Sequence, residues 1–113
     1  KMAVYSDISV DQGTDFSAEV SVDDSDGTLA NLTGYTVAGQ IRKTYSSSTA
    51  VNFVCSITGA STGEITIQLS NTVTAAMKPG RYVYDVEITK TSNGIKTRVI
   101  EGQVTVHPGV TQI

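Results

Sequence analysis

Apolar and polar side chains alternate along residues 79–89, a segment that begins with a Pro-Gly turn. The apolar side chains fall on even positions: Tyr82, Tyr84, Val86 and Ile88. The charged side chains fall on odd positions: Arg81, Asp85 and Glu87. Because successive side chains of a β-strand point to opposite faces, this pattern predicts a half-buried antiparallel strand with one solvated face.

Six further segments have strand character and are separated by turn residues. They cover residues 4–10, 16–22, 35–43, 51–57, 64–69 and 95–106. We expect the first to be a short edge strand, and Gly39 predicts a bulge or a bulky neighbour packed over the backbone. Seven short strands separated by turn residues predict an all-β fold, an immunoglobulin-like antiparallel β-sandwich. We expect one domain over residues 1–113, with flexible ends at 1–3 and 108–113.

The strand periodicity is interrupted at residues 70–77, which predict a short helical corner. Ser70 is a favourable N-cap, and Val73 and Met77 are spaced to pack against the sandwich. In immunoglobulin-like domains, a corner of this kind precedes a Gly-x-Tyr-x-Cys pattern whose tyrosine hydroxyl bonds back to the corner. Tyr82 fits this tyrosine, with Tyr84 in the place of the cysteine. The other interpretation is that Tyr82 is a core tyrosine with its hydroxyl at the rim.

The last two predicted strands can pair in more than one register. We favour a loop of at least three residues, which places Ile88 opposite Ile100 and Glu87 opposite Glu101. It also places Tyr84 opposite Val104 and Tyr82 opposite Val106. A two-residue Asn-Gly hairpin would instead place Val86 opposite Glu101. The apolar parity changes between Ile95 and Ile100, which predicts a β-bulge near Val99.

Composition excludes several classes of function. The chain has 113 residues, with eight Lys and Arg against eleven Asp and Glu and a net charge of −3. The absence of a basic stripe argues against binding to nucleic acid or to an anionic membrane surface. The single cysteine, Cys55, lies in an apolar alternation, so we expect a small core residue. No apolar run approaches the ~18 residues of a membrane span, and no secretory start is present, so we expect neither a membrane segment nor a signal peptide.

Two segments resemble a metal site or a catalytic histidine, but neither is complete. Asp24, Asp26 and Gly27 follow part of a calcium-loop pattern. Val22 and Thr33 stand where the first and last ligands belong, which favours a solvated turn. His107, the only histidine, lies beside a proline and has no nucleophile motif attached to it.

Asp85 and Glu87 lie two apart on one strand and superficially resemble the carboxylate pair of a glycoside hydrolase. Carboxylates at this spacing are more often solvated, or paired across the sheet with Lys96, Arg98 or Arg42. We therefore predict no catalytic, cofactor-binding or metal-ligating residues, and no enzymatic activity.

Four segments in this order resemble a known module: Leu32–Arg42, Gly63–Ile67, Pro79–Glu87 and Val99–Val106. Together they are similar to the small β-sandwich module of tailed-bacteriophage virion proteins, as in the N-terminal domain of upper baseplate proteins. The likeness extends from Gln12 to Val106. It implies a virion component without a catalytic motif, made in the host cytoplasm, that works through protein contacts.

Two functions are compatible with these observations. The first is a structural or adaptor component of a phage tail, baseplate, fibre or capsid decoration, which binds other virion proteins and itself. The second is a carbohydrate-binding or adhesive module. Sugar binding usually needs exposed aromatic rings that stack on the sugar. Tyr5 and Tyr45 are the only rings expected off the inner faces, so the structural or adaptor function is favoured. We expect partner contacts at the loops 44–50 and 23–27, or at the termini.

Overall fold

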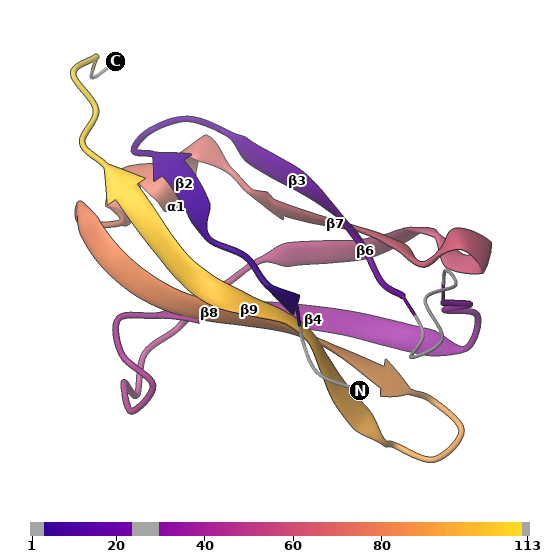
Figure 1. Ribbon diagram of the computed structural model, residues 1–113. Coiled ribbons are helices and arrows are strands. Elements are labelled where there is room, and N and C mark those ends of the chain that lie inside the picture. The colour runs from indigo at the N-terminus through magenta and orange to yellow at the C-terminus, as the bar shows by residue number, and fades with distance from the viewer. Residues whose placement is uncertain (1–3, 24–29, 112–113) are drawn as a thin grey trace.

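The computed structural model describes residues 4–23 and 30–111, which form two β-sheets packed face to face (Figure 1). The larger sheet contains, in spatial order, β1 (Val4–Tyr5), β9 (Lys96–His107), β8 (Gly80–Lys90), β4 (Tyr35–Arg42) and β5 (Val51–Asn52), and β2 (Ile8–Asp11) also pairs with β9. The smaller sheet contains β3 (Phe16–Ser21), β7 (Glu64–Leu69) and β6 (Val54–Gly59). The 3₁₀ turn η1 (Ala60–Thr62) and the helix α1 (Asn71–Ala76) complete the described elements. The predicted all-β sandwich is confirmed.

The core lies between the sheets, on the faces that the alternation predicts. On β7, Ile65, Ile67 and Leu69 are at most 2% exposed. The inner row of β8 consists of Tyr84, Val86 and Ile88, all of them buried. Burying an aliphatic or aromatic side chain of this size contributes roughly 1.5–3 kcal/mol, so these two rows hold the sheets together.

The N-terminal edge differs from the expected single antiparallel strand over residues 4–10. β1 and β2 are separate, and both run parallel to β9. The chain kinks between them, where the Ser6 carbonyl accepts a hydrogen bond from the Tyr84 hydroxyl at 2.5 Å. The Asp7 carboxylate accepts another from the backbone N–H of Gln103 at 3.1 Å. Gly102 leaves the space that this kink fills, because a Cβ there would collide with the Ser6 carbonyl.

Phe53 marks the point where the chain crosses from one sheet to the other. The sequence predicted one strand over 51–57, but β5 pairs with β4 and β6 pairs with β7. Phe53 is buried between these strands, and its ring meets the Tyr84 ring edge-on with 5.9 Å between centroids. It also covers Gly39, where an added Cβ would lie 3.1 Å from the Phe53 ring. The bulky neighbour predicted over Gly39 is therefore Phe53.

The helix α1 confirms the predicted corner between β7 and β8. Its N-cap is Ser70, whose hydroxyl accepts a hydrogen bond from the Val73 N–H at 3.3 Å. Met77 is buried, and Val73 packs against the core. The Tyr82 hydroxyl donates to the Lys78 carbonyl at 2.7 Å, which confirms the tyrosine corner.

The register between β8 and β9 corrects the favoured prediction. Ile100 lies opposite Val86, two residues from the predicted partner Ile88. Likewise, Tyr84 lies opposite Gly102 where Val104 was expected. Because the shift is an even number of residues, each side chain keeps its predicted face. The bulge near Val99 is confirmed, since the register shifts there.

The loop between β8 and β9 explains part of the shift. Its ends are joined by a hydrogen bond from the Lys90 N–H to the Ile95 carbonyl at 2.9 Å. Inside it, the Gly94 N–H donates to the Lys90 carbonyl, and Gly94 has a φ of 72°, which glycine adopts without strain. Glu101 is consequently opposite Asp85 and not opposite Glu87 as predicted.

Candidate functional site

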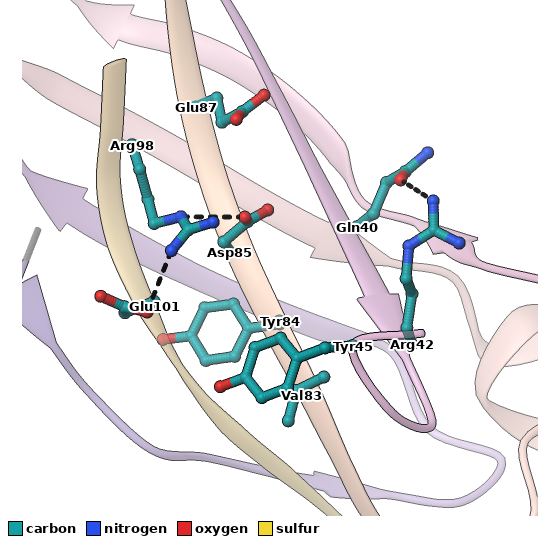
Figure 2. A pocket seen from close by; sticks show the side chains of 9 residues that line it. All are labelled: Gln40, Arg42, Tyr45, Val83, Tyr84, Asp85, Glu87, Arg98 and Glu101. Carbon is teal, nitrogen blue, oxygen red and sulfur yellow. Dashed lines mark hydrogen bonds and ion pairs between the residues drawn. The ribbon is translucent and has the colours of Figure 1, made fainter. Parts of the chain in front are cut away.

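A shallow hollow of about 260 Å³ lies on the outer face of the larger sheet, on the side away from the core (Figure 2). Outward-facing side chains of three neighbouring strands line it. They are Gln40 and Arg42 from β4, Val83, Asp85 and Glu87 from β8, and Arg98 and Glu101 from β9; Tyr45 from the β4–β5 loop and Tyr84 from β8 also line the hollow. The hollow therefore combines carboxylates, guanidinium groups, an amide and an aromatic ring.

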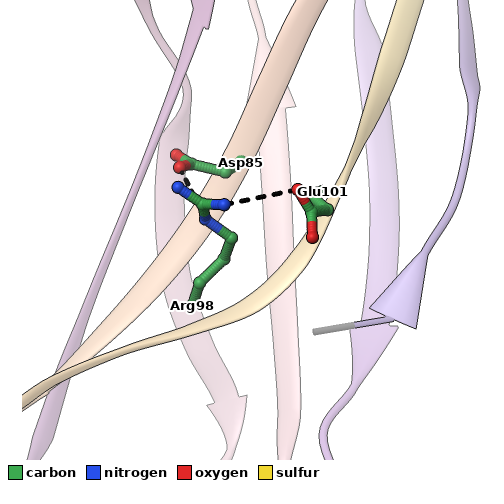
Figure 3. Close-up of polar contacts among 3 residues, drawn as sticks. All are labelled: Asp85, Arg98 and Glu101. Atoms are coloured by element: carbon green, nitrogen blue, oxygen red, sulfur yellow. Dashed lines mark hydrogen bonds and ion pairs between the residues drawn. The ribbon is translucent and has the colours of Figure 1, made fainter. Parts of the chain in front are cut away.

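The bulge at Val99 creates the charged floor of the hollow. Along a regular strand, residues 98 and 101 would point to opposite faces. Here Val99 and Ile100 are both buried, so Arg98 and Glu101 share the outer face. The Arg98 guanidinium lies with Nε 3.1 Å from Asp85 Oδ2 and with Nη1 3.3 Å from Glu101 Oε1 (Figure 3).

This ion-pair network shapes the surface more than it stabilises the fold. Asp85 and Glu101 are directly opposite each other, and like charges in that position repel. Arg98 offsets the repulsion by contacting both carboxylates. Its side chain is 47% exposed, and exposed pairs contribute only about 0–1 kcal/mol. The network therefore presents fixed charges to solvent at little gain in stability.

Arg42 holds the loop that carries Tyr45. Its guanidinium donates to the Ser47 carbonyl at 2.7 Å and to the Gln40 side-chain oxygen at 3.0 Å. Within the loop, the Thr44 N–H donates to the Ser47 hydroxyl at 3.0 Å. The predicted contact loop 44–50 is thus fastened to β4 beside the hollow.

Two exposed tyrosine rings flank the hollow. Tyr45 is 78% exposed and Tyr5 is 62% exposed, as the sequence predicted. Tyr5 pairs with Glu101 across β1 and β9, so it stands next to the ionic floor. The pKa of the Tyr5 phenol is raised, first by reduced hydration and then by the negative charge of Asp7, with Tyr45 and Glu101 acting in the same direction. The rings and carboxylates therefore form one surface.

Beneath this surface, Tyr84 connects the outer face to the core. Its ring is buried, and burial raises the pKa of its phenol to about 12, although the hydrogen bond to Ser6 acts in the opposite direction. Cys55 is half-buried and packs against the core, as expected, and burial raises the pKa of its thiol.

Of the other residues singled out from the sequence, Asp85 and Glu87 line the hollow, whereas His107 lies away from it. Asp85 pairs with Arg98 as predicted, and Glu87 lies opposite Arg98 in the register. His107 is exposed at the end of β9, opposite Asp11. The calcium-like turn at 24–27 falls outside the described residues. Sequence reasoning missed Glu101, and the parity change at Val99 was the signal that could have found it.

Two further observations bear on the kind of site. Within residues 4–23 and 30–111, no group of three or more His, Cys, Asp or Glu side chains is arranged to hold a metal ion. Neither helical segment in that part of the chain has the length and apolar character needed to cross a membrane.

Many solved structures are similar to this chain, among them the following three. InlP from Listeria monocytogenes has 16% identity and a TM-score of 0.48, over 90% of this chain and 26% of InlP. The NK cell receptor Nkp44 has 12% identity and a TM-score of 0.45, over 95% of this chain and 100% of the receptor chain. A family 123 glycoside hydrolase from Clostridium perfringens has 12% identity and a TM-score of 0.43, over 95% of this chain and 23% of the hydrolase. This chain thus spans about a quarter of the length of InlP and of the hydrolase.

The curated proteins contain no match to this sequence. A family model does match: residues 3–107 fit the one described as the LtfC-like, beta-sandwich domain. The match covers the nine strands of residues 4–23 and 30–111, from β1 to the end of β9. The chain therefore belongs to the LtfC-like β-sandwich domain family.

Proposed function

We propose that this domain is a non-enzymatic structural or adaptor component of a tailed-phage particle, in its tail, baseplate, fibre or capsid decoration. It acts through contacts with other virion proteins. The observation that carries the proposal is the outer face of the larger sheet, where Tyr5 and Tyr45 stand beside the Arg98 network. The sequence resembles virion β-sandwich modules in four segments that follow the same order, and this resemblance indicates that the partners are virion proteins.

The composition of this face suits protein recognition. Tyrosine and arginine are enriched at protein interfaces and among their hot spots, whereas lysine is depleted. The side chains that line the hollow include Tyr45, Arg42 and Arg98, and no lysine is among them. Because Arg42 and Arg98 are already held by neighbouring groups, binding a partner costs little additional side-chain entropy.

The same geometry argues against hydrolysis at the carboxylates. A glycoside hydrolase needs space for a sugar between its two carboxyl groups. Here the Arg98 guanidinium contacts both Asp85 and Glu101 and occupies the position between them (Figure 3). This arrangement favours a fixed charged surface over a reacting pair.

The test is incorporation into particles. Particles are banded in a density gradient from a lysate of the source strain, and their proteins are identified by mass spectrometry. We expect peptides of this chain in the particle band. Arg98→Glu, which reverses the central charge, should reduce its incorporation, whereas Glu19→Ala on the other sheet should leave it unchanged. Absence of the wild-type chain from the particles would overturn the proposal.

A glycan-binding module is the second candidate, favoured by one observation. Tyr5 and Tyr45 are exposed rings beside carboxylate and amide groups, a combination that can stack on a sugar and bond its hydroxyls. A glycan array separates the two functions. Binding to defined oligosaccharides that is lost in Tyr45→Ala would favour the glycan module over the protein adaptor.

A further inference from the structure

Most sheet edges of the described sandwich are protected against pairing with another strand. In the larger sheet, one edge is interrupted between β1 and β2, and the other consists of the two-residue β5 and the short part of β4 that β5 does not pair, residues 35–38. In the smaller sheet, β6 carries a register shift between Ile57 and Gly59. Short strands, interruptions and bulges are the usual protection of open edges.

β3 forms the longest regular edge among the described strands and has none of these features. It pairs with β7 without a register shift over six residues, Phe16–Ser21, and contains neither proline nor lysine. It ends the smaller sheet, whose order is β3-β7-β6 (Figure 1). A regular open edge of this length is a template for another strand.

The backbone groups available on this edge follow from the hydrogen-bond pattern. The Val22 N–H donates to the Gly63 carbonyl at 2.8 Å, in line with the pairing of β3 and β7. Residues two apart on a strand direct their backbone groups to the same side, so the even residues of β3 bond to β7. The N–H and C=O groups of Ser17, Glu19 and Ser21 therefore point away from the sheet.

The inner side chains of β3 are also incompletely covered. Phe16, Ala18 and Val20 are only partly buried, whereas Ile65 and Ile67 on neighbouring β7 are fully buried. The apolar row at this edge thus lacks a neighbour on one side. A strand added there would form backbone hydrogen bonds and cover apolar surface at once.

We propose that two copies of this chain associate through β3, pairing antiparallel about a two-fold axis at Ala18. In this register Ser17 of one copy faces Glu19 of the other, and Phe16 faces Val20. The hydrogen-bonded pairs then use the outward groups of Ser17 and Glu19, as an antiparallel ladder requires. The two three-stranded sheets become one continuous six-stranded sheet.

The charge of Glu19 favours this register over the adjacent one, in which the two-fold axis passes through residue 19. A two-fold axis at residue 19 would also use the outward backbone groups, but it would place the two Glu19 side chains opposite each other. Like charges in that position repel. With the axis at Ala18, each Glu19 faces a neutral serine. A symmetric pair is closed, so the association stops at a dimer.

Disulfide cross-linking tests the register. In antiparallel strands, a pair without mutual hydrogen bonds has Cα atoms about 4.5 Å apart, within the range of a disulfide. In a Cys55→Ser background, Ala18→Cys should form a covalent dimer that a reductant dissolves. Ser21→Cys, which lies on the same edge but far from its symmetry mate, is the matched control. Cross-linking of Ser21→Cys to the same extent, or none with Ala18→Cys, would overturn the register.

Sedimentation equilibrium from micromolar to submillimolar concentration tests the dimer itself. We expect a mass that rises from 11.9 kDa towards twice that value. Glu19→Pro removes an outward N–H and should abolish dimerisation, whereas Glu19→Ala should preserve it, with circular dichroism checking that both fold. Ser17→Glu should weaken the dimer about tenfold, because symmetry creates two repelling pairs, and Ser17→Lys should tighten it. A wild-type chain that stays monomeric throughout, or charge variants that behave alike, would refute the proposal.

Discussion

Gly102→Ala is the sharpest test of how the N-terminal edge is built. Gly102 lies opposite Tyr84, and both face the interior. A methyl group at Gly102 would collide with the Ser6 carbonyl and lie 2.7 Å from the Ser6 carbonyl carbon. These are backbone atoms, so the kink between β1 and β2 must move away from β9.

The magnitude follows from the hydrogen bonds that the kink would lose. Three bonds hold it: Ser6 N–H to Glu101 C=O at 2.8 Å, Tyr84 O–H to Ser6 C=O at 2.5 Å, and Gln103 N–H to Asp7 Oδ1 at 3.1 Å. At about 1 kcal/mol for each bond, Gly102→Ala should lower the free energy of unfolding by about 3 kcal/mol. Gln103→Ala, an exposed side chain on the same strand, should change it by less than about 0.5 kcal/mol.

Urea denaturation followed by circular dichroism measures these changes, and a double-mutant cycle isolates the cause. Tyr84→Phe alone removes the bond to Ser6 and should cost about 1 kcal/mol. In the Gly102→Ala background it should cost almost nothing, because Ser6 has already moved away from the hydroxyl. If Tyr84→Phe has the same cost in both backgrounds, Ser6 remains in place and the reasoning is wrong.

Three further predictions concern the corner and the core. Tyr82→Phe should lower the free energy of unfolding by about 1 kcal/mol in urea titrations, because its bond to the Lys78 carbonyl is lost. An unchanged urea midpoint would contradict the tyrosine corner. Thr74→Val should cost about 1–3 kcal/mol, because the fully buried Thr74 hydroxyl bonds both Gly13 N–H and Thr14 C=O, while Thr72→Val on the exposed side is the control. Burial raises the pKa of Tyr84 from 10 to about 12, so its protonated phenol stabilises the fold fully below pH 10, and that contribution is lost as pH rises towards 12. The stability advantage of wild type over Tyr84→Phe should therefore shrink between pH 10 and 12, and a constant difference would refute this.

The sequence was sufficient to predict the faces of the strands and the corner. The even positions of β8 are the inner ones, Ser70 caps a short helix, and Gly39 lies under a bulky ring, as predicted. These features depend on residues close together in the chain, or on a period of two that a register shift of two leaves unchanged. The core could therefore be predicted even though the strand partners could not.

The strand partners depend on contacts that no local pattern contains. The break of the predicted strand over 51–57 arises because Phe53 fills the core at the crossing between sheets. The parallel pairing of β1 and β2 with β9 depends on the space above Gly102 and on the Tyr84 hydroxyl, which lies 78 positions from Ser6. The periodicity of the sequence describes residues that are close together in the chain, so it does not predict contacts between residues this far apart.

The geometry of the candidate site depends on one such long-range feature, the register between β8 and β9. The parity change that predicted a bulge near Val99 also implied that Arg98 and Glu101 share a face, but the predicted register placed Glu101 beside Glu87. In the observed register Glu101 faces Asp85, and Arg98 reaches both carboxylates. The bulge thus keeps Arg98 on the outer face beside two carboxylates that would otherwise repel, and the three side chains form an ordered charged surface between two exposed tyrosines. With Val99 retained but no bulge, regular alternation from Ile100 would turn Arg98 to the buried side of β9, so the proposed interaction surface depends on the same bulge that was visible in the sequence.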